Sequence, residues 1–209
     1  MTERLQRALG ERLLHVTARC NVDGINKHGL MPAADIAKGA GKSTEEILLR
    51  SERLVIDSCF GRAMLNHQRP IAQHLNAARQ MLQDHSPESW AQMLDHRVFF
   101  WPENRGARFA RSIARDFDIA MLWLNTGKYL ERFLDLTDLS PINSGNFSQG
   151  GARVKRGDWL FVPASACIEA LRENRRKRGL VNSRDQVVEV SLRGSIPPDI
   201  LNELLIEIQ

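Results

Sequence analysis

The sequence feature that most constrains the fold is a dense aromatic and β-branched run near the middle of the chain, Val98-Phe99-Phe100-Trp101. Residues of these types favour strands, and Pro102, which cannot donate a ladder hydrogen bond, ends the run. Side chains along a strand alternate between its two faces, so Phe100 points one way and Phe99 with Trp101 the other. The run therefore predicts a buried strand with one aromatic face packed on the core.

The residue pattern before this strand differs from the pattern after it. Residues 11–17 predict a first strand, and residues 43–95 predict a helical block, in which Ser43-Thr44-Glu45-Glu46 forms a capping-box pattern and Ser86-Pro87 begins another helix. After the aromatic strand we expect helices near 103–116, 127–133 and 165–177, strands near 118–124, 159–162, 186–192 and 204–208, and a loop over 139–156. This layout belongs to the α+β class.

Length and composition indicate an ordinary globular chain. The 209 residues, 43% of them hydrophobic, suffice for one domain, which we expect to span residues 1–209 without a linker. No apolar run reaches the ~20 residues that cross a bilayer, and residues 1–10 lack the apolar core of a signal peptide. The three cysteines are far apart and have no metal-binding spacing. We therefore expect a cytoplasmic protein with free thiols, no membrane contact and no metal.

The net charge of +4 permits a polyanionic partner without requiring one. Its distribution is more informative, because five basic residues lie between positions 172 and 178, and Arg184 follows shortly after. Such a run is either the solvated end of a helix or a surface that contacts phosphate groups. The sequence leaves both interpretations open.

A glycine-rich segment, Gly39-Ala40-Gly41-Lys42-Ser43, superficially matches a nucleotide triphosphate-binding loop. That loop requires a glycine five residues before its Gly-Lys pair, where this chain has Ile36, and it must follow a buried strand. The preceding residues are polar and helix-like. The segment is therefore interpreted as a turn that leads into a helix.

Two polar residues lie near the end of the first predicted strand. His15 and Thr17 are two positions apart, so both side chains point to the same face. A neutral imidazole and a hydroxyl suit the hydrogen-bonding edge of a ribose or a carboxamide. Taken alone, a histidine in this position is more often a structural residue.

Glu189 stands inside an apolar strand pattern, Val187-Val188-Glu189-Val190. A carboxylate in a half-buried strand is unfavourable unless something uses it. The alternative is an ordinary surface glutamate that faces the edge of the sheet. Residues 194–200 then turn the chain sharply.

Together these patterns resemble the ADP-ribosyltransferase fold, most closely the DarT-type toxins that modify single-stranded DNA and related uncharacterised bacterial proteins. The resemblance covers residues 12–200 and depends on three landmarks. They are His15-x-Thr17 followed by Asn21-Val22, Ile25 and Gly29-Leu30; the aromatic strand ending at Pro102; and Glu189-Val190 shortly before Ile196-Pro197. The resemblance implies a split β-sheet core with a helical insertion after the first strand.

The resemblance also implies an enzyme that consumes NAD, with Glu189 as its catalytic residue. The carboxylate would stabilise the positive charge that develops on the ribose as the nicotinamide bond breaks. The residues expected to bind NAD come from the first two landmarks and from an arginine of the helical block: His15, Thr17, Asn21, Phe99 or Phe100, and Arg50 or Arg53, with Arg62 and Arg69 not excluded.

The chain departs from the family pattern in one respect. The family is often described by a histidine–tyrosine–glutamate trio, but the only tyrosine here, Tyr129, lies elsewhere in the sequence. Phe99 or Phe100 would have to take that place. The motif Asn143-Ser144-Gly145-Asn146 also resembles the uncharacterised relatives, but the sequence assigns it no role.

The residues around Glu189 favour a nucleic-acid acceptor. Transferases that modify arginine carry a Glu or Gln two residues before the catalytic glutamate, where this chain has Val187. The loop upstream carries the expected substrate-binding residues, Arg178, Arg184 and Gln186, which suit a phosphate backbone. We expect the acceptor to be single-stranded DNA or RNA, because its bases must be accessible.

The resemblance further implies a bacterial toxin or phage-defence effector, with an antitoxin protein as a possible partner. Two other functions remain open at this stage. One is an NAD-dependent RNA 2′-phosphotransferase, which uses the same fold, and the other is a catalytically degenerate module that binds NAD or nucleic acid.

Overall fold

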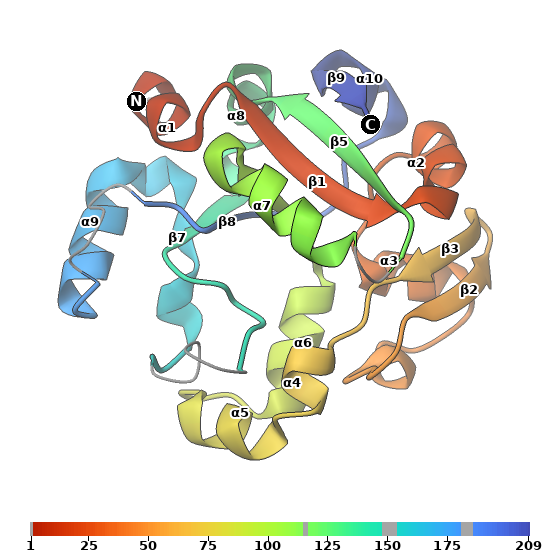
Figure 1. Cartoon of the computed structure of the whole chain (residues 1–209), viewed down its shortest axis with the longest axis horizontal. Helices are drawn as coiled ribbons and strands as arrows, with labels where there is room; N and C mark the ends of the chain where they lie inside the picture. The colour runs from red at the N-terminus through yellow and green to blue at the C-terminus, as the bar shows by residue number, and fades with distance from the viewer. Residues whose placement is uncertain (1, 115–116, 148–153, 181–185) are drawn as a thin grey trace.

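The computed structural model describes residues 2–114, 117–147, 154–180 and 186–209 of the chain. Its centre is an antiparallel sheet of seven strands in the order β7-β6-β8-β4-β1-β5-β9 (Figure 1), and a two-stranded hairpin lies beside it. The sheet strands are β1 (Arg12–Ala18), β4 (Arg97–Pro102), β5 (Ile119–Asn125), β6 (Thr137–Ser140), β7 (Val162–Pro163), β8 (Glu189–Arg193) and β9 (Leu205–Ile208). The hairpin strands are β2 (Leu54–Ser58) and β3 (Gly61–Leu65).

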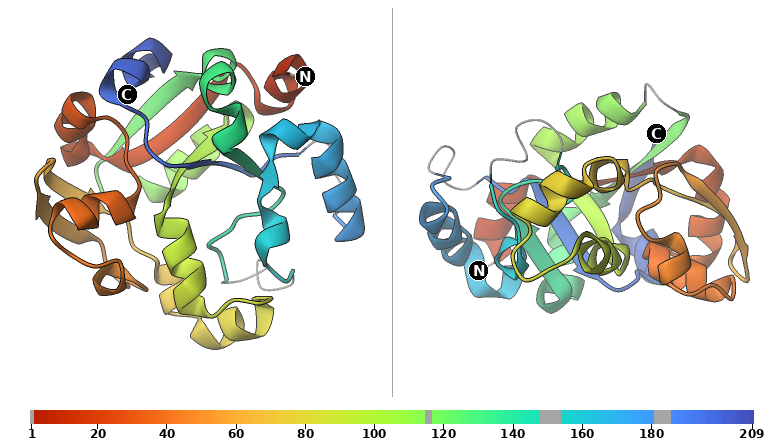
Figure 2. Two further views of the ribbon diagram at one scale, coloured as in Figure 1. Left: turned by 180° about the vertical axis from the view of Figure 1, so that it is seen from behind. Right: turned by 90° about the horizontal axis from the view of Figure 1, so that it is seen from below.

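Helices cover both faces of the sheet, as the views in Figures 1 and 2 show. The main core lies on the face covered by α1, α8, α9 and α10, and α7 crosses the other face over β1. No helix in the described ranges combines the length and apolar character needed to cross a membrane. The helices are α1 (Thr2–Leu9), α2 (Val22–His28), α3 (Ala33–Gly39), α4 (Arg69–Ala72), α5 (Leu75–Met81), α6 (Pro87–Asp95), α7 (Glu103–Ile113), α8 (Thr126–Phe133), α9 (Cys167–Lys177) and α10 (Pro198–Leu204).

The sheet splits between β1 and β4. Strand β1 pairs with β5 along its whole length, but with β4 only through Leu13 with Pro102 and Leu14 with Trp101. Beyond these pairs the side chain of His15, and not a backbone amide, contacts the carbonyl of Phe99. Two half-sheets, β7-β6-β8-β4 and β1-β5-β9, are thus joined at one end and separate towards the other.

Two segments far apart in the sequence meet beside this split. Leu30 and Ile196 form an isolated antiparallel bridge, in which each backbone N–H donates to the other residue's carbonyl at 2.9 and 2.8 Å. The preceding Gly29 ends α2 with φ +84°, and a Cβ there would overlap the carbonyl oxygen of Ile196. Only glycine accommodates both conditions without strain.

The α+β class and most elements outside the helical block are confirmed. The predicted strands at 11–17, 97–101 and 118–124 correspond to β1, β4 and β5. The predicted start of a helix at Ser86-Pro87 is also correct, because the Ser86 side chain accepts a hydrogen bond from the backbone N–H of Ser89 at the start of α6.

The helical block predicted for residues 43–95 is only partly correct, because its second half is helical but a β-hairpin occupies its first half. Leu54 and Val55 lie on β2, which pairs with β3. Gly61, with φ +90°, lets the chain turn back between the two strands, and Ile56 of β2 is buried in a small hydrophobic cluster. Only one hydrogen bond of the predicted capping box is present, in which the Glu46 carboxylate accepts from the backbone N–H of Ser43. The element that follows is a single 3₁₀ turn over Glu45–Ile47. The part of the block between this hairpin and Ser86 forms two short helices, α4 and α5.

Several shorter elements also differ from the prediction. The helices α1 and α10 were not predicted, although each buries two leucines of an amphipathic turn against the core. Strand β6 occupies the beginning of the predicted loop at 139–156. The strand predicted for 159–162 is a 3₁₀ turn at Asp158–Leu160 followed by the short β7.

Candidate functional site

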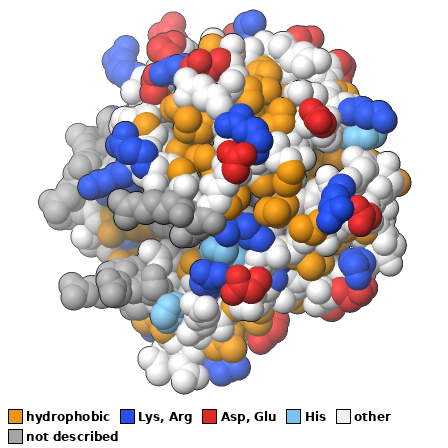
Figure 3. All heavy atoms as spheres, turned by 45° about the vertical axis from the view of Figure 1, so that its right-hand side comes forward, with side chains coloured by type: hydrophobic (Ala, Val, Ile, Leu, Met, Phe, Trp, Pro, Cys, Tyr) orange, Lys and Arg blue, Asp and Glu red, His pale blue; other side chains and the backbone are white. Residues whose placement is uncertain are grey.

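A cavity of about 490 Å³ opens where the half-sheets separate. This volume falls within the ~300–1,000 Å³ range of small-molecule sites. Its wall is made by β1, β4, α7, the β2–β3 hairpin, the segment 66–71, and the start of β8 with the nearby loop at 143–145. On the face turned forward in Figure 3, hydrophobic side chains lie exposed among basic and acidic ones, with a histidine near the middle.

Glu189 lines this cavity as the first residue of β8, and it is only 3% exposed. One carboxylate oxygen, Oε1, accepts a hydrogen bond from Nδ2 of Asn143 at 2.6 Å, and Oε2 accepts one from the backbone N–H of Ser144 at 2.8 Å. Burial raises the pKa of Glu189 to about 7, against the effect of these donors. The carboxyl group is therefore held in one orientation and changes charge near neutral pH.

The donors to Glu189 are held by a buried arginine. Arg156 is 1% exposed, and its Nε and Nη2 donate to the carbonyl oxygens of Asn143 and Asn146 at 3.1 and 2.8 Å. Its guanidinium also lies over the ring of Phe147. Burial lowers the pKa of Arg156 to about 10, and the nearby charge of Glu189 opposes that change.

The Asn143–Asn146 motif thus acquires a position in the site that the sequence did not assign. Its backbone is folded around the Arg156 guanidinium, and its amide groups face the Glu189 carboxylate. Sequence reasoning missed Arg156 altogether. The available signal was the cluster of turn-forming residues before a short basic stretch that ends at Arg156, which does not by itself indicate a contact with Glu189.

His15 and Thr17 both line the cavity, as their shared strand face predicted. Nδ1 of His15 lies 2.9 Å from the carbonyl oxygen of Phe99, and burial lowers the pKa of His15 to about 4. A carbonyl oxygen only accepts, so Nδ1 of this neutral ring carries the hydrogen and Nε2 remains an acceptor. The Thr17 hydroxyl accepts a hydrogen bond from Asn21, and its own hydrogen can still be donated.

Asn21 also lines the cavity, but its amide group is occupied by the protein. Nδ2 donates to the Thr17 hydroxyl and to the carbonyl of Met64, both at 2.9 Å, and Oδ1 accepts from the Met64 N–H at 2.7 Å. Both amide hydrogens are therefore committed. Asn21 orients Thr17 and fastens the β2–β3 hairpin to β1.

The structure separates the aromatic residues of β4 into two groups. Phe99 and Trp101 line the cavity, and Trp101 stacks on Phe109 of α7 with ring centroids 3.6 Å apart. Phe100 is fully buried in the main core, so the prediction that Phe100 could contact the cofactor is wrong. Tyr129 is buried there too, bonded to Thr137, and it lies outside the cavity wall.

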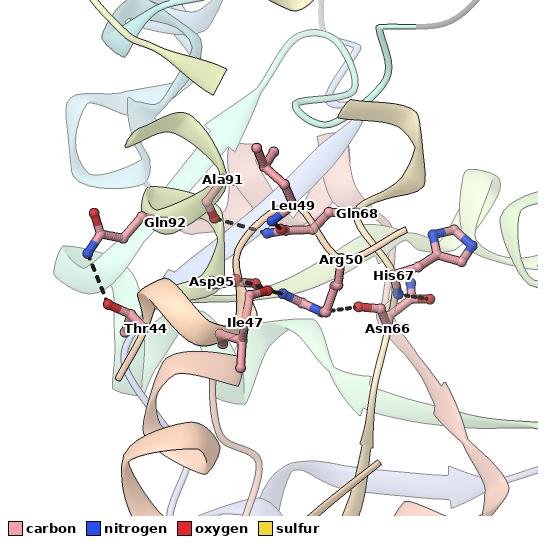
Figure 4. Close-up of polar contacts among 10 residues, drawn as sticks. All are labelled: Thr44, Ile47, Leu49, Arg50, Asn66, His67, Gln68, Ala91, Gln92 and Asp95. Carbon is pink, nitrogen blue, oxygen red and sulfur yellow. Dashed lines mark hydrogen bonds and ion pairs between the residues drawn. The ribbon is translucent and has the colours of Figure 1, made fainter. Parts of the chain in front are cut away.

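Arg50 lines the cavity as part of a buried ion pair (Figure 4). Its Nη1 and Nη2 each donate to one carboxylate oxygen of Asp95 at 2.8 Å, and the exposed fractions of the two side chains are 11% and 5%. Arg50 also donates to the carbonyl oxygens of Ile47 and Asn66. These contacts use four of its five N–H groups, so Arg50 mainly supports the cavity wall.

Further basic side chains line the cavity. Arg53 and Arg62 line it, and the Arg53 guanidinium lies 3.5 Å from the centroid of the Phe117 ring. His67 lines it as well, and burial together with the charges of Arg53 and Arg69 lowers the pKa of His67. Nδ1 of His67 is buried and has no hydrogen-bond partner among the described residues.

The residues predicted to bind the acceptor lie away from the cavity wall or outside the described ranges. Arg178 is exposed, with its guanidinium 4.4 Å from the centroid of the Trp159 ring. Gln186 lies against Arg105 of α7, where its amide oxygen can accept from Nε at 3.1 Å. Arg184 falls in the segment 181–185, which the structure does not describe.

Within the described ranges, no group of three or more His, Cys, Asp or Glu side chains is arranged to hold a metal ion. Residues 11–204 match the model of a family described as "Family of unknown function (DUF7002)". The matched segment includes every cavity residue described above. A search of curated proteins finds no match to the chain.

Proposed function

The chain belongs to this family of unknown function, and from that premise we propose that it is an NAD-dependent ADP-ribosyltransferase that modifies a nucleic-acid acceptor. The observation that carries the proposal is the placement of Glu189. A buried carboxylate, oriented by two donors, lines a cavity whose wall also carries arginine side chains. The split between β1 and β4 agrees with the split-sheet core that the resemblance implies.

The side chains of β1 and β4 suit the nucleoside parts of NAD. Nε2 of His15 can accept a hydrogen bond from one ribose hydroxyl while the Thr17 hydroxyl donates to the other. Phe99 and Trp101 offer aromatic surface for the flat nicotinamide ring. Asn21 contributes by holding Thr17 in place.

The basic side chains of the cavity wall suit the diphosphate of NAD. Arg53 provides a guanidinium, the group that best matches phosphate geometry. The unpartnered Nδ1 of His67 supports a ligand at this place, because buried polar atoms are normally hydrogen-bonded. Arg50 keeps the wall in position through Asp95.

In the proposed reaction, Glu189 stabilises the breaking of the bond between nicotinamide nitrogen and ribose C1′. The bonding electron pair leaves with nicotinamide, and the carboxylate of Glu189, near the ribose 2′-hydroxyl, offsets the positive charge that develops on the ribose. An acceptor atom then bonds to C1′ and loses its proton, for which the same carboxylate is a suitable general base. With a pKa of about 7, Glu189 is close to the value that favours proton transfer at neutral pH.

The proposal is tested by incubating the protein with labelled NAD and separated DNA, RNA and protein fractions. We expect label in a nucleic-acid fraction, and a loss of about 100-fold or more in the variant Glu189→Gln, which keeps the shape but not the charge. Glu131→Gln, at an exposed position on α8, is the matched control. Transfer by Glu189→Gln at the control rate would contradict the assignment.

The same assay distinguishes the remaining alternatives. Label confined to protein would overturn the nucleic-acid acceptor and leave the transferase activity. Release of a 2′-phosphate from a 2′-phosphorylated RNA would identify the phosphotransferase, for which the arginine side chains of the cavity wall are the favouring observation. Binding of NAD without its consumption would identify a degenerate module. Arrest of bacterial growth by the wild type but not by Glu189→Gln would support a toxin.

A further inference from the structure

Helix α7 carries three arginines at three-residue intervals: Arg105, Arg108 and Arg111. Residues three apart occupy neighbouring parts of a helix surface. Arg108 and Arg111 are exposed, and Arg105 is half-buried. The helix therefore displays a row of guanidinium groups on its outer side, which we call the α7 arginine row.

Among the residues that the structure describes, the charge of this row is not balanced by ion pairs with acidic side chains. Within the described part of the chain, no carboxylate lies within ion-pair distance of the three arginines. The basic run of α9 differs, because Arg172 pairs with Glu169, and Arg176 and Lys177 pair with Glu173. Much of the charge that the sequence placed at positions 172–178 is thus compensated inside its own helix.

The arginines of the row are also close to each other and to further positive charge. Burial first, and then the charge of Arg108, lower the pKa of Arg105. The charge of Arg105 in turn contributes to a lowered pKa for Arg175 of α9. Like charges at short range are unfavourable and are relieved by an anion bound between them.

The row runs beside the candidate site. Phe109 and Ile113, on the inner side of the same helix, line the cavity, and Phe109 stacks on Trp101. The first arginine of the row, Arg105, contacts Gln186, three residues before Glu189. A chain bound along the outer side of α7 would therefore pass close to Glu189.

We propose that the α7 arginine row binds the phosphate backbone of the single-stranded nucleic acid that is modified at Glu189. The identity of this ligand as the acceptor depends on the proposed function. Guanidinium groups bind phosphate in a bidentate manner, and successive members of the row rise by about 4.5 Å along the helix, short enough to follow an extended strand. The stacked Trp101 and Phe109 rings, which line the cavity, connect the row to the candidate site.

The test measures binding of a fluorescent single-stranded DNA, and separately of a single-stranded RNA, by anisotropy in a salt titration without NAD. The variant is Arg108→Glu/Arg111→Glu. The matched control is Lys27→Glu/Arg79→Glu, which makes the same charge change at exposed residues outside the cavity wall. Arg108→Lys/Arg111→Lys keeps the charge and removes the bidentate geometry, and thermal unfolding verifies that each variant is folded.

We expect the glutamate variant to bind at least about tenfold more weakly than the control, with a salt slope shallower by about 1.4, the loss of two phosphate contacts on a single strand. The lysine variant should retain most of the slope. Equal binding by the glutamate variant and the control, or no salt-dependent binding by the wild type, would overturn the inference.

The two proposals fail separately. If nucleic-acid binding depends on the row but the protein consumes no NAD, the nucleic-acid-binding surface is supported and the transferase activity is contradicted. The opposite result is that the Arg108→Glu/Arg111→Glu variant transfers ADP-ribose to nucleic acid at the control rate. That result would support the proposed transferase activity and contradict the proposed binding role of the α7 arginine row.

Discussion

Two buried carboxyl groups, Asp95 and Glu189, line the cavity, and they are held in different ways. Asp95 is joined directly to Arg50 by a two-pronged ion pair, whereas Glu189 is held by the uncharged donors Asn143 and Ser144, with Arg156 acting on the loop behind them. In the first arrangement each charge neutralises the other. In the second, the carboxyl group is fixed in space by uncharged donors. Burial raises the pKa of both groups, and that of Glu189 reaches about 7.

Under the proposed function, the Arg50–Asp95 pair supports the fold and Glu189 supplies the chemistry. A carboxylate bound to a guanidinium is a poor base and a poor electrostatic partner for a substrate, because its charge is already compensated. A carboxylate held by neutral donors remains available to a developing positive charge. Substitutions around the two carboxyl groups should therefore change different properties of the protein.

The largest expected effect is on stability, at the Arg50–Asp95 pair. Arg50→Met leaves Asp95 as a buried charge without its partner and should lower the free energy of unfolding by about 3–5 kcal/mol. Urea denaturation measures the change, and the double variant Arg50→Met/Asp95→Leu should recover much of it. If Arg50→Met lowers the free energy of unfolding by less than about 1 kcal/mol, the Arg50–Asp95 pair does not have the structural role that distinguishes it from Glu189.

The next effect is on activity, around Glu189. Arg156→Met removes the charged donors that hold the Asn143 and Asn146 carbonyls, and it removes a positive charge that lowers the pKa of Glu189. We expect kcat to fall by about tenfold or more, as lost charge-assisted hydrogen bonds suggest. We also expect the rise of activity with pH, centred near 7 in the wild type, to move to higher pH.

The pH profile separates a positioning role for Arg156 from a purely structural one. A variant that is only destabilised would lose activity without moving the midpoint. Arg156→Lys, which keeps the charge, should leave the midpoint near the wild-type value even if kcat is reduced. An unchanged midpoint in Arg156→Met would show that Arg156 does not influence Glu189.

The smallest effect concerns stability as a function of pH. Since burial raises the pKa of Glu189 from 4.5 to about 7, the folded state binds this proton more tightly, and the associated stability is complete below 4.5 and lost as pH rises through 7. His15 acts in the opposite sense: its pKa is lowered from 6.5 to about 4, so its contribution is lost as pH falls through that interval. Because His15 is common to both proteins, the difference in unfolding free energy between the wild type and Glu189→Gln isolates the contribution of Glu189. Urea unfolding at a series of pH values should show this difference changing between 4.5 and 7, in the direction of a relative loss for the wild type as pH rises. A difference that does not depend on pH in this interval would contradict the raised pKa.

The parts of the site that the sequence could predict are those fixed by strand alternation. His15 and Thr17 share a face because they are two residues apart, and Glu189 interrupts an apolar strand, so the period of a strand was enough to single them out. The same alternation separated Phe100 from Phe99 but could not tell which face was core. That choice depends on where the sheet splits, which is a property of strand pairing and not of the strand itself.

Other parts depended on contacts that local patterns do not encode. The apolar residues of β2 fit a helical period nearly as well as a strand, and only pairing with β3 decides between them. Arg156 contacts carbonyl oxygens, which every residue possesses, so nothing in the identity of its partners marks it in advance. The same holds for the pairing of Arg50 with Asp95, 45 positions away.

The bridge between Leu30 and Ile196 has a mechanical consequence for the cavity. The half-sheets are pinned to each other at the β1–β4 junction and again, through this bridge, by the segment that follows β8. A gap fastened at two places cannot widen by simple rotation of its sides, because backbone hydrogen bonds would have to break first. We therefore expect ligands to enter a nearly rigid frame, and adjustment to their shape to come from the β2–β3 hairpin, which is fastened to β1 through the side chain of Asn21.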